Sequence, residues 1–541
     1  FGTTGTVGDG HARADQGSVA EPAPRGSDRE SALREAGRAA LTGSTMRGSD
    51  VTRDTGVGGG SETGGDETGG FVGDIGTAVA KFGFGGEDAP TGVLSSRLGC
   101  VFDSNQAYVK GANGVPLLRE LTAEDYKVPD DYPARLHTRS PFCSPPQNQQ
   151  CVSSWLHGDV SSLGAQRFAK GESCVVRSPI LDGEIDDWDC VEELWREAFA
   201  LNKTSGSDQP VLAATPSNAS PKARAQYLEL LFETFGCNAA YLARNATLAA
   251  FAAGRASALV VDCGAGTTSV SPVVDGYVLT KGIRTSRRGG DLVDAHAHEL
   301  LTKLCGGTAP LPLAAVRREG QKTYDAWPDQ FRTFCARECV RDLKESYGVI
   351  PKKWGLAVGL KEDRKQFHLP DGTVVDVTTD IVRAPEQLFE EVVREEIEPE
   401  KAEEPTVKVV RDARVGNRAL QPPQITPLIA DPLIATLPEM VKGSLERVDV
   451  DVRKDLLLNI VLTGGGSCAP GTAERLHSDV ALSLCAPFKA KVISPSEFER
   501  KFGVWIGGSI LSSLGSFQQM WLSRKEYEDD GPTRLVEGRW D

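Results

Sequence analysis

The sequence has few methionines, no long apolar run and no excess of basic residues. Its 541 residues include 3 Met, and 60 Lys plus Arg stand against 75 Asp plus Glu, a formal net charge of −15. A chain this acidic is not expected to hold DNA by bulk neutralisation of phosphates. No apolar run reaches the ~18 residues of a membrane-spanning helix, and the start of the chain lacks a charged segment followed by an apolar one. These absences predict a soluble intracellular protein.

The 12 cysteines are also without a recognisable pattern. They are scattered through the chain, often inside apolar runs, and none of their spacings resembles the paired spacing of a zinc site. We therefore expect reduced and mostly buried thiols.

The composition changes abruptly near residue 70. Residues 1–70 hold 17 of the 58 glycines, no aromatic residue after Phe1 and few large aliphatic residues. Such a segment cannot bury enough apolar surface to offset its chain entropy, so we predict a disordered tail at 1–70 and a folded body at 71–541. Within the body, the Pro- and Gln-rich stretch 98–171 predicts a loop-rich insertion. The stretch 386–404 contains 9 Glu and predicts a solvated acidic loop.

Two similar strand–turn–strand patterns stand 188 positions apart. Each begins with a short apolar run that ends in an aspartate, Asp74 in the first and Asp262 in the second. Small residues follow in both turns: Gly76 and Thr77 in the first, Gly264 and Gly266 in the second. Turns of this composition let backbone N–H groups approach an anion closely, as in glycine-rich phosphate sites.

Each aspartate could hold a Mg²⁺ ion through water molecules, and Lys81 would add a positive charge on the second strand of the first hairpin. A third cluster, Gly464–Gly466, follows the aliphatic run Ile460–Leu462 and has the form of a strand-to-helix turn, a common resting place for a nucleotide. Any one of these elements alone is more often an ordinary tight turn. Because three occur in order, each after a strand, they favour a nucleotide site between two lobes.

The same segments resemble the actin family. The run DIGTAVAKFGFGGEDAP from Asp74 resembles the first phosphate loop of actins, and VVDCGAGTTSVSPVVDGYVL from Val260 resembles the second. The run VWIGGSILSSLGSFQQMWLSRKEYEDDGP from Val504 follows actins almost residue for residue and is highly specific. The similarity extends from Phe71 to about Pro532, with gaps at 98–173 and 350–440.

This resemblance implies an α/β fold of the actin-like ATPase type, with two lobes and four subdomains, shared with heat-shock chaperones and sugar kinases. It places ATP and a divalent cation, Mg²⁺ or Ca²⁺, in the cleft. The implied subdomains are about 71–97, 174–252 and 503–541 for the first, 98–173 for the second, 253–288 and 438–502 for the third, and 289–437 for the fourth.

The resemblance also implies a set of binding residues. Asp74, Gly76, Thr77 and Lys81, with Asp262, Gly264, Gly266 and Thr268, would meet the phosphates and the cation. The adenosine pocket would be formed by Gly289, Lys344, Glu345, Gly465 and Lys501.

Several positions depart from the actin pattern. The glutamine that organises the attacking water in actins is Asn245 here, the histidine of the second loop is Ser269, and the acidic residue between its two glycines is Ala265. Hydrolysis needs a water held in line with the γ-phosphate, so we expect slow or absent turnover with binding retained. Cys468 and Ala469 replace the adenine-side pair of the third loop, which affects nucleotide affinity or base preference.

Among relatives, the pattern is most similar to the nuclear class of actin-related proteins, through SPILDGEIDDWDCVEELW from Ser178, FHLPDG from Phe367 and SSLGSFQQMW from Ser512. That class implies a nuclear subunit of chromatin-remodelling and histone acetyltransferase complexes, paired with actin on a helix of a scaffold or motor subunit and contributing to nucleosome or histone contact. The acidic stretch 386–404 is a candidate for contacting histones, although most such runs are solvated faces.

The actin-type groove for amphipathic helices maps to apolar or aromatic residues here. On periodicity alone, Leu511 and Leu514 are equally consistent with the core face of an amphipathic helix. The residues that match the groove are Phe251, Tyr277, Leu511, Leu514 and Met520.

Two other functions are consistent with the same fold. A filament-forming cytoskeletal ATPase is one, although the segment 98–173 does not resemble the actin loop that inserts into a neighbouring subunit. A sugar-kinase-type phosphotransferase is the other, and it would need a carboxylate base facing an acceptor hydroxyl, for which no Asp or Glu stands out.

Overall fold

The structure is a computed structural model. It describes residues 69–102, 106–110, 116–120, 152–169, 173–316, 324–325, 327–353, 366–390, 435–483 and 489–539. The tail predicted at 1–70 lies outside the described residues apart from its last two positions. No helix in these ranges is both long enough and apolar enough to cross a membrane.

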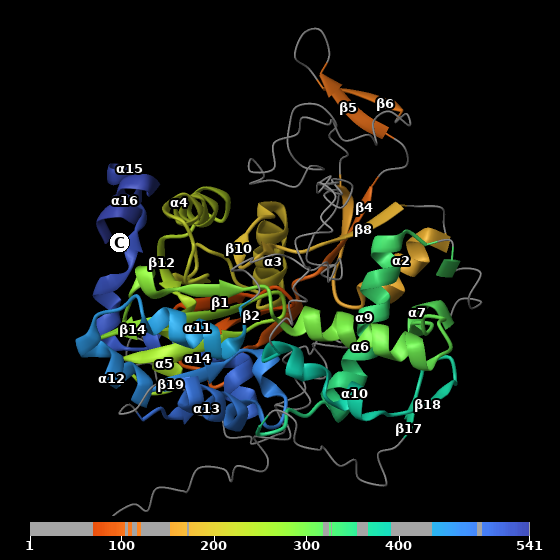
Figure 1. Ribbon diagram of the computed structural model, residues 1–541. Coiled ribbons are helices and arrows are strands. Elements are labelled where there is room, and N and C mark those ends of the chain that lie inside the picture. The colour runs from red at the N-terminus through yellow and green to blue at the C-terminus, as the bar shows by residue number, and fades with distance from the viewer. Residues whose placement is uncertain are drawn as a thin grey trace, which may run out of the picture.

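A first six-stranded sheet forms the base of one lobe (Figure 1). Its strand order is β21-β12-β11-β1-β2-β3, with β1 parallel to β11 and antiparallel to β2. The strands are β1 (Phe71–Ile75), β2 (Val79–Phe84), β3 (Gly92–Ser95), β11 (Val211–Thr215), β12 (Ala239–Arg244) and β21 (Leu522–Ser523). Aromatic side chains including Phe71, Phe82 and Trp195 are fully buried and pack together between this sheet and helix α3 (Trp188–Leu201).

A second six-stranded sheet carries the other lobe. Its order is β15-β14-β13-β19-β20, with β16 paired to β14. These strands are β13 (Ala258–Cys263), β14 (Thr268–Val274), β15 (Tyr277–Val278), β16 (Arg284–Ser286), β19 (Ile460–Thr463) and β20 (Val492–Ile493). Helices α6 (Gly290–Leu304), α9 (Asp329–Tyr347) and α11 (Leu437–Leu445) supply buried side chains to the core of this lobe.

Two helices join the lobes through a shared apolar core. Helix α5 (Asn245–Ala252) packs on α14 (Glu497–Ser512), and at their crossing a Cβ on Gly507 would stand 1.9 Å from the carbonyl oxygen of Leu248. Only glycine permits that approach. The same core contains Val72 of the first sheet and Val260 of the second, so the two lobes are continuous at this end of the molecule.

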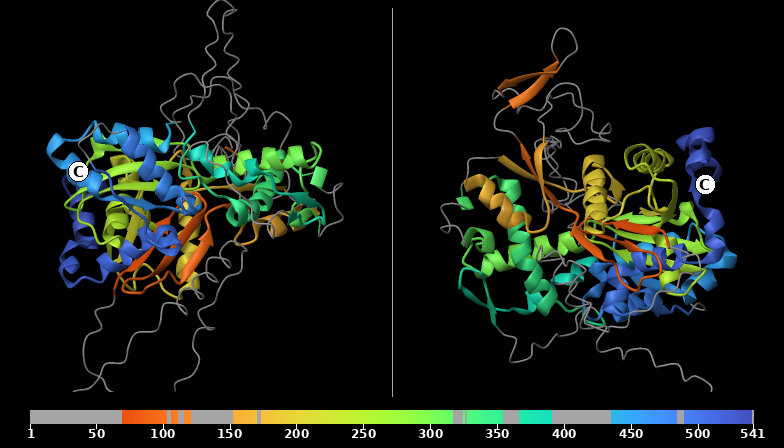
Figure 2. Two further views of the ribbon diagram at one scale, coloured as in Figure 1. Left: turned by 60° about the horizontal axis from the view of Figure 1, so that its bottom comes forward. Right: turned by 180° about the vertical axis from the view of Figure 1, so that it is seen from behind.

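The region between β3 and α3, where a loop-rich insertion was predicted, has regular structure in its described parts. Strands β4 (Leu98–Phe102), β7 (Val152–Leu156) and β8 (Ser173–Arg177) form a small sheet that packs with helix α2 (Val160–Ala169). Figure 2 shows α15 (Arg524–Asp530) and α16 (Pro532–Arg539) at the end of the molecule opposite α2.

The remaining described elements are short or peripheral. They are β5 (Gln106–Lys110), β6 (Pro116–Glu120), β9 (Ile180–Leu181), β10 (Glu184–Ile185), α4 (Pro221–Glu229), η1 (Leu230–Thr234), η2 (Thr280–Gly282), α7 (Leu313–Val316), β17 (Gln366–His368), β18 (Val374–Asp376), α10 (Thr379–Val382), η4 (Ala384–Leu388), α12 (Val450–Leu458), η9 (Gly465–Cys468), α13 (Thr472–Ser483) and η10 (Gly515–Met520).

The acidic stretch 386–404 corrects one prediction. Its first residue, Glu386, is fully buried and not solvated, because its carboxylate accepts a hydrogen bond from Arg475 at 2.8 Å and another from Arg383 at 2.6 Å. Beyond 390 the stretch lies outside the described residues. The chain returns at Ala435, whose carbonyl accepts a hydrogen bond from Ser286 at 2.8 Å.

Candidate functional site

A cavity of about 390 Å³ lies between the two lobes. Its walls come from both strand–turn–strand hairpins, from the turn after β19, from α9 and from the start of α14. Cavities of this size suit a small molecule of nucleotide dimensions.

The first hairpin is internally neutralised. Asp74 on β1 stands opposite Lys81 on β2, and Lys81 Nζ lies 2.8 Å from the Asp74 carboxylate. The Gly76 N–H donates to the Val79 carbonyl at 3.1 Å and closes the turn, which leaves Thr77 at its tip. The turn and both charged side chains line the cavity.

The second hairpin has the same shape with a different charge balance. Asp262 pairs with Ser269 across β13 and β14, and the Gly264 N–H donates to the Thr267 carbonyl at 2.9 Å. Burial, and then the charge of Asp74, raise the pKa of Asp262 to about 6, although Lys81 lowers it. The two aspartates therefore act on one another across the cavity, which is the arrangement that a bound cation relieves.

The hairpins touch at their tips. A Cβ on Gly266 would lie 2.9 Å from Thr77 Cγ2, so the second turn packs directly on the first. The third turn reaches the same point, because Gly464 has φ +86 and a Cβ there would lie 2.4 Å from Asp262 Oδ1. Glycine at these positions lets three turns meet around the aspartates.

The opposite wall of the cavity is held by ion pairs. Lys344 Nζ lies 2.6 Å from Asp294, and Lys501 Nζ lies 2.7 Å from Glu497. Burial alone would lower the pKa of Lys501, but the hydrogen bond with Glu497 and the nearby negative charges of Glu497 and Glu345 together outweigh it and raise that pKa. The predicted residues Glu345 and Gly465 line this wall together with Cys468 and Ala469.

All but three of the predicted binding residues line the cavity, the exceptions being Gly266, Thr268 and Gly289. Thr268 is fully buried, and its hydroxyl donates to the Arg288 carbonyl. A Cβ on Gly289 would lie 2.4 Å from the Ala265 carbonyl oxygen. Thr268 and Gly289 therefore lie behind the second turn and shape it, whereas Gly266 lies at its tip against Thr77.

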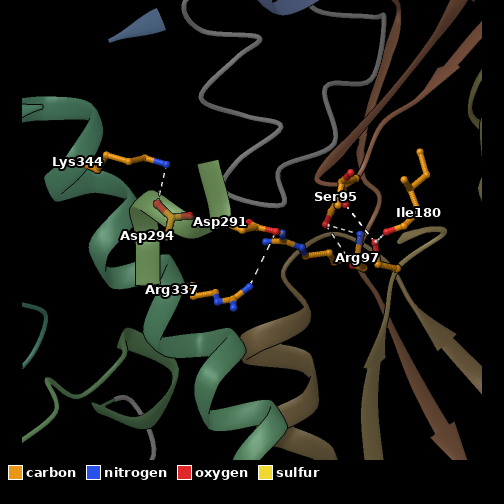
Figure 3. A network of polar contacts seen from close by, with 9 residues as sticks. Ser95, Arg97, Ile180, Asp291, Asp294, Arg337 and Lys344 are labelled. Atoms are coloured by element: carbon orange, nitrogen blue, oxygen red, sulfur yellow. Dashed lines mark hydrogen bonds and ion pairs between the residues drawn. The ribbon is translucent and has the colours of Figure 1, made fainter. Parts of the chain in front are cut away.

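Sequence reasoning missed Arg97 and Asp291, which also line the cavity. Arg97 Nη2 lies 2.6 Å from both carboxylate oxygens of Asp291, although the two residues are 194 positions apart, and Figure 3 shows the two side chains meeting between the lobes. Burial would raise the pKa of Asp291, but Arg97 and Arg337 together hold it below its usual value. No local pattern in the sequence marks such a distant pair.

The three departures from the actin pattern also line the cavity: Asn245, Ser269 and Ala265. The Oδ1 atom of Asn245 is buried and has no hydrogen-bond partner among the described residues. A buried acceptor without a partner is satisfied by water or by a ligand. An acceptor takes a hydrogen bond from water, and the two aspartates supply the carboxylates that a cation neutralises, so these residues fit a hydrated divalent cation.

Four of the predicted groove residues lie on α5, β15, α14 and η10, and Leu514 lies in the turn between α14 and η10. Tyr277 is 79% exposed, Leu514 46% and Met520 45%, so Leu514 is a surface residue and not part of the core. Phe251 and Leu511 are half-buried, and Ile510, which sequence reasoning omitted, is 43% exposed.

Comparisons with known proteins agree with this geometry. The model of the actin family matches residues 65–540. The chain is 32% identical over 481 residues to "Actin-related protein 4" of Oryza sativa subsp. indica, covering 86% of this chain and 98% of that protein. For the proteins of the same name, identity is 31% in Arabidopsis thaliana (87% of this chain, 98% of that protein) and 28% in Schizosaccharomyces pombe (87% and 97%). The chain therefore belongs to the actin family and is an actin-related protein of the type of these relatives.

Proposed function

We propose that the chain binds ATP with Mg²⁺ or Ca²⁺ as a structural ligand, hydrolyses it poorly, and serves in the nucleus as a subunit of chromatin-remodelling and histone acetyltransferase complexes. Actin-family folds generally bind a nucleotide together with a divalent cation. The observation that carries the nucleotide part is the pair of hairpins, whose aspartates face one another across a cavity lined by Gly76, Gly264 and Gly465.

The proposed binding roles follow the cavity walls. Asp74 and Asp262 would hold the cation through water, and the turn residues Gly76, Thr77 and Gly264 would meet the phosphates with Lys81. Lys344, Glu345, Gly465 and Lys501 would contact the adenosine. The bound cation would supply charge neutralisation for the phosphates.

Weak hydrolysis is supported by the groups on the cavity wall. Asn245 is one methylene shorter than glutamine, and neither Ser269 nor Ala265 can relay or accept a proton as histidine and aspartate do. These three side chains therefore neither hold an attacking water as glutamine does nor take up its proton.

Stability and turnover assays test this proposal. Protein stripped of nucleotide should gain thermal stability with Mg-ATP, release almost no phosphate, and stay in the supernatant on sedimentation. The variant Arg196→Ala, on the exposed face of α3, should behave identically. Filament-stimulated turnover and a pellet would instead support the cytoskeletal alternative.

The subunit role is supported by the exposed apolar residues around α5 and α14. Tyr277, Leu514 and Met520 are large apolar or aromatic groups, such as a helix-in-groove site presents to an amphipathic helix. The proposed partners are actin, a helical scaffold or motor subunit, and histones or the nucleosome through the assembly. The proposed body, residues 71–541, consists of two lobes with two subdomains each.

Affinity purification from nuclear extract tests the partners. The wild-type chain should recover actin and a remodelling motor, whereas the double variant Tyr277→Ser, Leu514→Ser should lose them. Val450→Ser is a matched control, because Val450 is an exposed apolar residue on α12 (65% exposed) outside the predicted groove. Loss of partners in the control as well would contradict the groove assignment.

A further inference from the structure

Helix α9 belongs to two hydrophobic cores at once. Its first half contributes Phe331, Phe334 and Cys335 to a core shared with α2, β4 and β8. Its second half contributes Val340 and Leu343 to the core of the second lobe. Because β4 follows β3 of the first sheet directly in the chain, α9 also joins the two lobes, and Figure 1 shows it at the end of the body away from α5 and α14.

The contact between α2 and α9 is close and mostly aromatic. We call Gly164, Phe168, Trp327 and Phe331 the apolar seam. A Cβ on Gly164 would lie 2.5 Å from the Phe331 ring, and the Phe168 ring packs on Trp327 at 6.2 Å and on Phe331 at 4.9 Å between centroids. Trp327 and Phe331 are only 3% and 1% exposed. Packing of this kind belongs to the interior of a lobe and not to a hinge that opens freely.

A buried polar cluster lies next to the seam. The Arg97–Asp291 pair is almost fully buried, with Arg337 Nη1 4.0 Å from the Asp291 carboxylate. Beside it, the Ser161 hydroxyl on α2 donates to the Glu338 carboxylate on α9. Both contacts join an element of the first lobe to an element of the second.

The polar cluster is connected to the second hairpin. The Asp291 N–H donates to the Ala265 carbonyl at 2.8 Å, and the Gly290 N–H donates to the Gly264 carbonyl at 3.0 Å. The second half of α9 also presents Lys344 and Glu345 to the cavity. A change in the seam would therefore be felt at both walls of the cavity.

Another ion pair between the lobes offers a contrast. Arg287 binds Asp182 at 2.8 Å, but their side chains are 38% and 35% exposed. Solvent-exposed pairs contribute little to stability, whereas removing one partner of a buried pair leaves an uncompensated charge. The Arg97–Asp291 pair should therefore matter far more than Arg287–Asp182.

We propose that the apolar seam and the Arg97–Asp291 pair fasten the two lobes together whether or not a nucleotide is present, so that rupture of this fastening limits nucleotide release. Closure of the cleft is then a property of the folded chain, and the nucleotide is enclosed by it. Arg97 is a positioning residue in this scheme, acting through Asp291 on the second hairpin. The part concerning release rests on the proposed nucleotide binding; the part concerning closure does not.

Hydrogen exchange of the full chain tests the closure. In wild-type protein, the amides of α2 and of the first half of α9 should be equally protected with Mg-ATP and after its removal with EDTA and apyrase. In Arg97→Ala and, separately, in Phe331→Leu, their protection should become dependent on nucleotide. Protection of β11 and β12 in the first sheet reports that each variant is folded.

Release of a fluorescent ATP analogue provides the second measurement. Arg97→Ala should speed release by about tenfold or more, while Arg287→Ala should change it by less than about twofold, following the difference between buried and exposed pairs. Equal rates in the two variants, or loss of α2 and α9 protection in nucleotide-free wild type, would overturn the inference. If no nucleotide binds at all, the proposed function fails, and exchange in the Arg97 and Arg287 variants still decides whether the lobes are fastened.

Discussion

The two hairpins share one backbone design and differ in charge. Lys81 lies 2.8 Å from Asp74 and neutralises it, whereas the residue opposite Asp262 on the second hairpin is the uncharged Ser269. Burial and the neighbouring Asp74 instead raise the pKa of Asp262. The charge on the first hairpin is thus neutralised within the protein, whereas the charge on the second hairpin would be neutralised only by a bound cation.

This difference teaches which features of the site belong to folding and which belong to binding. A charge that is satisfied within the chain stabilises the fold with or without ligand. A buried charge that is left to an external cation destabilises the empty protein and is relieved on binding. Five experiments would break or sharpen the comparison.

Exchanging the two aspartates for asparagine should have the largest effect. Asp262→Asn should weaken Mg-ATP binding at least about tenfold, ~1.4 kcal/mol, yet stabilise the empty protein by about 1–3 kcal/mol at pH 7, because a buried charge is removed. Asp74→Asn should destabilise the empty protein, because Lys81 loses its partner. Thermal unfolding with and without Mg-ATP measures both.

The empty protein also gives the sign of the pH dependence. Because the folded pKa of Asp262 is raised from 3.8 to about 6, the penalty of its charge is fully present above pH 6 and is lost progressively as the pH falls from 6 toward 3.8. Wild-type protein in EDTA should therefore lose part of this penalty between pH 7 and 5 and the rest by about pH 4, and Asp262→Asn should lack that component. Identical pH profiles for the two proteins would contradict the assignment.

The contact between the hairpin tips comes next. Gly266→Ala would place a methyl group 2.9 Å from Thr77 and should cost about 1–3 kcal/mol of stability by overpacking. Gly465→Ala is the matched control, since a Cβ there has no atom within 4 Å, and it should change stability by no more than ~0.5 kcal/mol. Denaturant unfolding distinguishes them, and equal costs would argue against close contact of the tips.

Restoring the glutamine and the histidine that actins carry tests why hydrolysis is expected to be weak. The double variant Asn245→Gln, Ser269→His should raise phosphate release about tenfold or more, because a longer amide and an imidazole can hold and relay the proton of water. Asn245→Asp serves as a control, because it changes the charge of the side chain without lengthening it. Unchanged turnover in the double variant would mean that the loss of activity has another cause, such as Ala265.

The supporting hydroxyls should show the smallest effects. Thr268→Val removes a buried hydrogen bond to the Arg288 carbonyl behind the second hairpin and should cost about 1 kcal/mol. Ser178→Ala removes the 3.2 Å hydrogen bond to the Thr77 carbonyl at the first hairpin and should cost less, about 0.5 kcal/mol. Chemical denaturation of both variants would show whether the second hairpin depends more on its surroundings.

Local patterns predicted much of the fold. The strands that carry Asp74 and Asp262 and the turns that follow them appear where the sequence placed them, and the actin-family fold is confirmed. Apolar periodicity and glycine turns are short-range features, so one segment suffices to recognise them.

What the sequence could not provide depends on partners far along the chain. Glu386 is buried because Arg475, 89 positions away, neutralises it, and Asp291 is held by Arg97. Thr268 was placed at the phosphates, yet its hydroxyl points to the Arg288 carbonyl behind the turn. Charge pairing across lobes and the direction of a single side chain are set by tertiary packing, which no local window contains.

The chain leaves the described body after residue 390 and returns at 435, and both sides of this gap are tied to the same strand and its extension. Ser286 binds the Ala435 carbonyl and Arg288 binds the Gln387 carbonyl. Because the residues on both sides are held in place, the entropic cost of connecting them rises only slowly with the number of residues between them. A purification tag or a reporter domain inserted between residues 390 and 435 should therefore leave the hairpins in place.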